Sequence, residues 1–179
     1  MSHGAVVSRE APARREAPAQ AGAVLVIGYG NALRTDDGLG WHAAARLAAD
    51  PRLAGATILR CHQLTPELAF DVSLASFVVF VDADHGRAGG LTVAPIEPAE
   101  AALGGPSLTH HLDAGALLAL AAELFGARPA AVAVSVGAIS MDAGEHLSPG
   151  VEAMLAHVVD AVALLAASGR IAIARAARA

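Results

Sequence analysis

The sequence predicts an α/β fold of three layers, in which helices cover both faces of a mostly parallel, twisted sheet of about five strands. Short β-branched runs alternate along the chain with segments of helical periodicity, and this alternation is typical of such folds. Hydrophobic residues make up 55% of the chain and aromatic residues only 3%, so Ala, Val, Leu and Ile must fill the core. A chain of 179 residues accommodates one such domain and is too short for two ordinary ones.

The first strand and helix are expected on either side of a glycine-punctuated loop. The run AVLVIG at 23–28 is β-branched and ends in glycine, as expected of a strand buried on both faces. Small and apolar residues then recur at helical spacing within 38–50, until Pro51 stops the helix. Thr35 and Asp36 are both placed to cap this helix, and we assign the cap to Asp36.

The remaining elements continue the alternation. Further strands are expected at 56–61, 77–81, 91–95 and 131–136. Helices are expected at 66–75, at 113–125 and from about 148 onwards. We assign the strand at 91–95 to an edge of the sheet.

Both ends of the chain are predicted to lie outside the domain, which we expect at 23–168. Residues 1–22 are polar and contain Ala, Pro and Arg without the apolar run of a signal peptide, which predicts a disordered tail. At 169–179 the arginines leave little to bury, which predicts a loose basic tail. The most apolar stretch, 151–168, is interrupted by Glu152, His157 and Asp160, so we expect no membrane span.

Charge and cysteine content exclude several classes of function. Twelve basic residues against 17 acidic ones give a net charge of −5, which argues against nucleic acid as a partner. The single cysteine, Cys61, excludes an internal disulfide and a cysteine-cluster metal site within one chain. We therefore expect a protein of the reducing cytoplasm.

Carboxylates follow two of the predicted strands, at the sheet edge where doubly wound folds bind ligands. Asp36 and Asp37 come after the first strand, and Asp82 and Asp84 directly follow the strand at 77–81. Four carboxylates at one edge would repel unless a cation or a donor-rich ligand offsets their charge. Nearby loops supply imidazole nitrogens from His85, His110 and His111. The set predicts a mixed oxygen and nitrogen site for a borderline divalent ion such as nickel, zinc or manganese.

Some of these residues have simpler interpretations. The simpler interpretation of Asp37 is that it lies in the first turn of a helix and only stabilises the helix dipole. The other histidines are assigned to ordinary surface or core positions: His42, His62, His146 and His157. A raised carboxylate pKa, caused by crowding among Asp36, Asp37 and Asp82, would suit a general base.

Other enzyme classes find little support. The loop GYGN resembles the start of a dinucleotide-binding motif, but Leu33 replaces its third glycine, and Asp36 and Asp37 would repel a pyrophosphate. Neither a GxxxxGK[ST] loop nor a GxSxG elbow is present, and Cys61 lacks the surroundings of a nucleophile.

Four segments together resemble the hydrogenase maturation proteases. The loop GYGNALRTDDGLG resembles their N-terminal signature, and FVVFVDA resembles their second acidic motif. LTHHLDAGALLAL resembles their histidine motif, and VSVGAISMDAGEHLSPGVEAML resembles their closing strand, loop and helix. These segments cover most of residues 23–168.

The resemblance implies a metal-assisted endopeptidase. It would remove a C-terminal extension from the nickel-loaded precursor of a nickel-iron hydrogenase large subunit. Asp37, Asp82 and His110 would carry catalysis and contact the nickel, which is recognised in the substrate, and no organic cofactor is implied. We assign Asn31 and His111 to substrate binding, with His111 also the fallback metal ligand. The enzyme is expected to act as a monomer in the cytoplasm.

Two alternatives and one departure accompany this interpretation. A chaperone-like module would bind the precursor or its nickel centre without turnover. A metal-dependent hydrolase of small amides would instead hold its metal tightly and cleave simple substrates. Where many members of the family carry a Gly-Gly turn after the second strand, this chain has CHQLTPEL, so the loop bordering the cleft differs.

Overall fold

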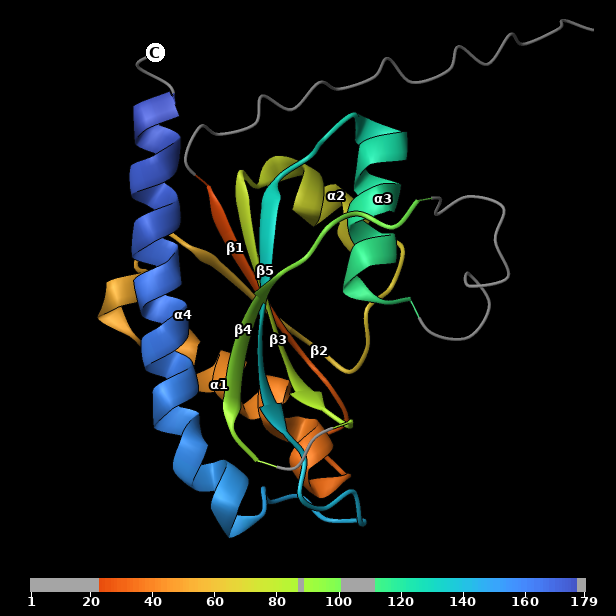
Figure 1. The fold of residues 1–179 in the computed structure, drawn as a ribbon, viewed down its shortest axis with the longest axis vertical. Coiled ribbons are helices and arrows are strands. Elements are labelled where there is room, and N and C mark those ends of the chain that lie inside the picture. The colour runs from red at the N-terminus through yellow and green to blue at the C-terminus, as the bar shows by residue number, and fades with distance from the viewer. Residues whose placement is uncertain (1–22, 87–88, 101–111, 177–179) are drawn as a thin grey trace, which may run out of the picture.

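The computed structural model describes residues 23–86, 89–100 and 112–176, which form one five-stranded sheet with helices on both faces (Figure 1). The strand order is β2-β1-β3-β5-β4. Four strands are parallel, namely β1 (Val24–Tyr29), β2 (Thr57–Cys61), β3 (Phe77–Asp84) and β5 (Ala130–Gly137). Strand β4 (Leu91–Pro95) pairs antiparallel with β5 at the edge. The predicted three-layer α/β fold is confirmed, as is the edge position of the strand at 91–95.

Helices cover both faces of the sheet (Figure 1). One face carries α1 (Leu39–Ala48) and α4 (Pro149–Ala176), and the other carries α2 (Leu68–Leu74) and α3 (Ala114–Phe125). Two short 3-10 helices, η1 (Thr35–Gly38) and η2 (Pro51–Leu53), flank α1. Because side chains alternate across a strand, β3 serves both cores. Val79 and Val81 belong to the core under α1 and α4, and Val78 and Phe80 to the core under α2 and α3.

Strand β3 is longer than its sequence predicts. We expected it to end at residue 81, with Asp82 and Asp84 in the loop beyond, but it continues to Asp84. Its parallel pairing with β5 extends that far, with Asp82 opposite Ser135 and Asp84 opposite Gly137. Asp82 is therefore held by a sheet backbone rather than by a loop.

Helix α4 also runs further than expected. It reaches Ala176, so the prediction of a loose tail is wrong for residues 169–176. Alanine and arginine are strong helix formers and no proline interrupts this stretch, which lets the helix propagate from its packed part. The predicted tail at 1–22 lies outside the described residues.

Within α4, the segment Pro149–Gly169 is long and apolar enough to cross a membrane by length and composition alone. Its apolar stripe nevertheless packs on the sheet, because Val151, Leu155, Val158 and Val162 are all buried. This burial accounts for the composition of α4 as that of a core helix.

Close contact between α1 and the sheet explains two glycines of the first loop region. A Cβ atom on Gly28 would collide with the backbone carbonyl of Gly40 in α1. A Cβ atom on Gly40 would in turn collide with the backbone oxygens of Val81 and Tyr29. These glycines let the first turn of α1 lie directly on β1 and β3, which brings the preceding turn to the carboxyl ends of both strands.

Candidate active site

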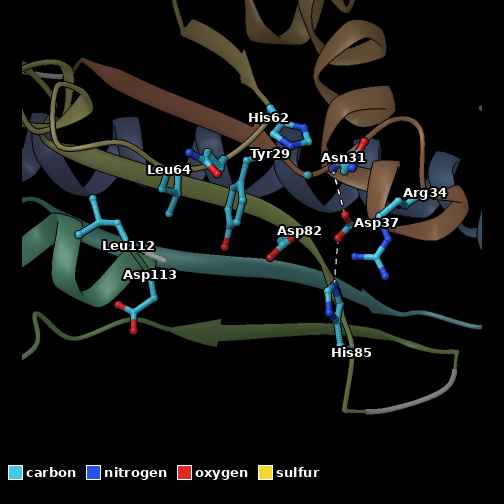
Figure 2. Close-up of a pocket in the computed structure, with 12 residues that line it drawn as sticks. Tyr29, Asn31, Arg34, Asp37, His62, Leu64, Asp82, His85, Leu112 and Asp113 are labelled. Carbon is cyan, nitrogen blue, oxygen red and sulfur yellow. Dashed lines mark hydrogen bonds and ion pairs between the residues drawn. The ribbon is translucent and has the colours of Figure 1, made fainter. Parts of the chain in front are cut away.

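A cavity of about 370 Å³ opens at the carboxyl ends of the central parallel strands (Figure 2). Strands β1 and β3 are neighbours in the sheet, and the chain passes to opposite sides of β1 when it forms β2 and β3. Doubly wound folds bind their ligands at this kind of switch point. The cavity is lined by Tyr29, Gly30, Asn31, Arg34, Asp37, His62, Gln63, Leu64, Asp82, His85, Leu112 and Asp113.

The helix η1 carries two consecutive acids into different surroundings. Asp37 lines the cavity, whereas Asp36 is fully buried. Asp36 is not the cap of α1 that we expected, since the residue at that position is Gly38, without a side-chain hydrogen bond. Its carboxylate instead accepts hydrogen bonds from the N–H groups of Ile139, Ser140 and Ser148 at 2.7–2.8 Å, and from the Ser148 hydroxyl at 2.8 Å.

Asp36 is buried because backbone N–H groups of the segment 138–148 need an acceptor. A buried N–H group needs an acceptor, and three such groups converge on Asp36. Burial by itself would raise the pKa of Asp36, but the hydrogen bonds from Ser140, Ser148 and Ile139 outweigh it and hold the pKa below its usual value. Asp36 therefore remains ionised inside the protein.

Asp37 is held in the cavity by two contacts. Its Oδ2 atom accepts a hydrogen bond from the backbone N–H of Asn31 at 3.2 Å, and its Oδ1 atom lies 3.1 Å from Nε2 of His85. Figure 2 shows Asp37 between these two partners. The side chain of Asn31 accepts a hydrogen bond from the N–H of Leu33, so it also shapes the loop.

Asp82 reaches the same cavity from β3. It lies beside Tyr29, and its Oδ1 atom accepts a hydrogen bond from the N–H of Ala83 at 2.7 Å. Burial raises the pKa of Asp82 to about 6, although the hydrogen bond from Ala83, the Tyr29 hydroxyl and the nearby His85 act in the opposite direction. Crowding by Asp37 contributes least, so desolvation rather than the expected repulsion is the main cause. Burial and the charge of Asp82 also raise the pKa of Tyr29.

The histidines are only partly accounted for. His110 and His111 lie outside the described residues, and the residues that follow them, Leu112 and Asp113, line the cavity. His85 was expected only as one of several nitrogen donors, yet it contacts Asp37. The signal that places it there is the length of β3, since His85 directly follows the last strand residue.

The loop after β2 forms a further wall, as its position in the sequence suggested. His62, Gln63 and Leu64 of this loop line the cavity, although we had assigned His62 to an ordinary position. Burial raises the pKa of the Cys61 thiol at the end of β2, which disfavours the thiolate that a nucleophile requires.

The described residues supply oxygen donors to the cavity without a complete metal site of their own. Asp37 and Asp82 both line it. Within residues 23–86, 89–100 and 112–176, no three His, Cys, Asp or Glu side chains are grouped to hold a metal ion. What this part of the cavity offers is a pair of carboxylates able to bind a cationic or hydrogen-bond-donating ligand.

Comparison with solved structures links this fold to one group of proteins. No protein-family model and no curated protein matches the chain. The hydrogenase maturating endopeptidase HybD from E. coli superimposes with a TM-score of 0.62 at 25% identity, over 82% of this chain and 94% of that one. The NiFe hydrogenase maturation protease HycI from Thermococcus kodakarensis gives a TM-score of 0.62 at 24% identity, over 80% and 92% of the two chains.

A third neighbour agrees. The hydrogenase 2 maturation peptidase from a Thaumarchaeota archaeon has a TM-score of 0.58 at 24% identity, over 78% of this chain and 95% of that one. All three neighbours are matched over nearly their whole length. The resemblance in sequence is thereby confirmed in structure: these three solved structures are hydrogenase maturation proteases, and the chain shares their fold.

Proposed function

We propose that this protein is an endopeptidase of hydrogenase maturation, which removes a C-terminal extension from the nickel-loaded large-subunit precursor of a nickel-iron hydrogenase. The observation that carries the proposal is the position of Asp37 and Asp82. Asp37 reaches the cavity from η1 and Asp82 reaches it from β3, in a fold shared with hydrogenase maturation proteases. The likeness to those enzymes supports a protease role, and the two carboxylates supply the chemistry for it.

In this proposal nickel is a feature of the substrate. Asp37 and Asp82 offer carboxylate oxygens, and His110 adds an imidazole, which is a donor set suited to a borderline divalent ion such as nickel. His110 is proposed from the sequence motif, and two residues beyond it in the chain Leu112 lines the cavity. Binding the nickel centre of the precursor would place the adjoining peptide in the cavity, so that cleavage follows nickel insertion.

The chemistry is the addition of water to the scissile carbonyl, followed by departure of the amine. A base must accept a proton from the water as it attacks, and the leaving nitrogen must receive a proton. Both carboxylates line the cavity, and we propose that one of them accepts the first proton. A cavity of about 370 Å³ falls in the size range of ligand sites and admits a short peptide segment. We propose that Asn31 and His111 contact this segment.

The test is a processing assay with the precursor of a nickel-iron hydrogenase large subunit from the same organism. The protein is mixed with nickel-loaded precursor and, in parallel, with nickel-free precursor, and the loss of the extension is followed as a shift on a gel. Cleavage of the loaded form alone supports both the activity and nickel as its signal. Cleavage of both forms removes nickel as the signal, and binding without cleavage identifies a chaperone-like module instead.

The proposed enzyme acts as a monomer in the cytoplasm. Size-exclusion chromatography with light scattering checks the first point, because a monomer has a mass near the 17.9 kDa of one chain. A mass of twice that value would contradict it.

A further inference from the structure

The buried carboxylate of Asp36 has a structural position that the proposed chemistry does not use. It is the one fully buried charged side chain in the described part of the molecule. Its four hydrogen-bond donors all come from residues 103 to 112 positions further along the chain. Three of these donors bind Oδ2, and the N–H of Ser148 binds Oδ1, so both oxygens of the carboxylate are hydrogen-bonded. Asp36 thus joins the turn after β1 to the segment that leads from β5 to α4.

The turn that it joins is conformationally unfavourable. Thr35 has a φ of +38°, which is rare for a β-branched residue. Its hydroxyl donates to the carbonyl of Ser140 at 2.7 Å, and its N–H donates to the carbonyl of Gly144 at 2.9 Å. The same segment that supplies donors to Asp36 therefore also holds Thr35. Such a conformation persists only when its surroundings impose it.

Asp37 follows directly in this turn. Its N–H donates to the carbonyl of Arg34 at 3.0 Å, and its own carbonyl lies where a Cβ atom on Gly30 would be. From this backbone position the carboxylate reaches the N–H of Asn31 at 3.2 Å. If the turn relaxed towards the conformations that threonine prefers, the carboxylate of Asp37 would move within the cavity.

We propose that Asp36 is a positioning residue for Asp37. By binding the segment 138–148, it holds the strained turn that directs the Asp37 carboxylate into the cavity. The end of the domain thereby fixes the geometry of a site at its beginning. This inference rests on the proposed function, in which Asp37 contacts the nickel-bearing substrate.

The test compares two variants of the contact between Asp36 and the segment 138–148 with a control variant that is also expected to lower the stability of the protein. Asp36→Asn replaces one acceptor oxygen with an amide group that faces a buried N–H donor. Ser148→Ala is milder, since it removes only the hydroxyl bond and keeps the backbone N–H. Val158→Ala is the control, because it leaves a gap in the core under α4 and Val158 does not line the cavity. All are assayed with nickel-loaded precursor at a temperature at which each variant stays folded.

The expected result is a fall in kcat that stability does not explain. Asp36→Asn should lower kcat about 10- to 100-fold, as expected when a reacting group is misplaced by about 1 Å. Ser148→Ala should lower it less, and Val158→Ala should leave it unchanged despite a lower Tm. If Asp36→Asn does not fold, the Ser148→Ala comparison carries the test. An unchanged kcat in the variants of the contact overturns the inference.

A second measurement needs no precursor. The backbone N–H of Asn31 donates to Asp37, so its amide NMR signal and exchange rate report the position of that carboxylate. Both should change in Asp36→Asn and stay as in wild type in Val158→Ala, while the sheet amide of Val79 is constant throughout. An Asn31 amide that does not respond overturns the inference. Failure of the wild type to cleave its precursor would instead overturn the proposed function and leave this measurement to test the positioning.

Discussion

At the scale of single residues, neighbouring acids in this chain have different roles because their surroundings differ. Asp36 is buried among backbone donors that keep it ionised, and Asp37 borders the cavity beside His85. Asp82 is largely desolvated, and its pKa is raised to about 6. The residue type alone assigns none of these roles, which depend on the donors that the fold brings to each carboxylate.

Loss of either cavity carboxylate should abolish processing without unfolding the protein. We expect Asp37→Asn and Asp82→Asn each to lower kcat/KM at least about 100-fold, because each removes a charged group from the substrate site. Asp84→Asn is the matched control, since Asp84 lies on the same strand outside the cavity and binds the N–H of Gly86. Gel-based processing rates and circular dichroism check the prediction. Unfolded variants, or a control equally impaired, would contradict it.

Asp82→Asn should also make the protein more stable at alkaline pH. Folding raises the pKa of Asp82, so ionisation of this group destabilises the folded state. The cost is absent below the usual pKa of a carboxyl group and is fully developed above pH about 6. Urea unfolding should therefore show a gain of about 2 kcal/mol at pH 8 and almost none at pH 3. A gain that is equal at both pH values would show that desolvation of the carboxylate is not its cause.

At the scale of elements, the length of β3 and the contact between α1 and the sheet determine the site. Because β3 continues to Asp84, it presents Asp82 on a rigid strand and releases His85 at its end. Because Gly28 and Gly40 allow backbones to touch, α1 begins directly over β1 and β3. Together these two features place η1 beside Asp82.

Gly40→Ala tests the contact between α1 and the sheet, because two arguments predict opposite changes in the free energy of unfolding. Helix propensity alone predicts a gain of about 1 kcal/mol, since alanine is the better helix former. The structure predicts a loss of about 1–3 kcal/mol or more, because the new methyl group would meet the backbone oxygens of Val81 and Tyr29. The free energy of unfolding in urea decides between them, and a stabilised variant would contradict the close contact.

At the scale of the whole molecule, the first loop and the last helix are linked through Asp36. The pKa of Asp36 is lower in the folded protein than the usual value of a carboxyl group. Ionised Asp36 therefore stabilises the fold at pH values above that usual pKa. As the pH falls through the lowered pKa, the carboxylate becomes protonated and this stabilisation is lost.

We therefore expect Asp36→Asn to be less stable than wild type by about 2 kcal/mol at pH 7, with a difference that shrinks as the pH falls towards 3. Urea midpoints at pH 7, 5 and 3 measure this. A difference that stays constant over the range would indicate that lost packing, and not lost charge, destabilises the variant.

Much of the fold was predictable because local patterns specify it. The five strands and four helices follow from β-branched runs, helical spacing and proline stops, and all of them are present. The ends of β3 and α4 were not predicted, since pairing with β5 and propagation from a packed helix depend on distant contacts. Topology was enough to predict Asp37 and Asp82 at one edge of the sheet. The role of Asp36 was not predicted, because its hydrogen-bond donors lie more than 100 residues away in the chain.

The link through Asp36 also has a consequence for the order of events during synthesis. Residues 139, 140 and 148 leave the ribosome long after the loop that carries Asp37, and until they do the buried carboxylate has no donors. Contacts between distant parts of a chain form late in folding. A nascent chain that lacks residues 139–148 would therefore contain both acids of the cavity without their final arrangement, so the proposed peptidase activity would arise only after this segment has been made.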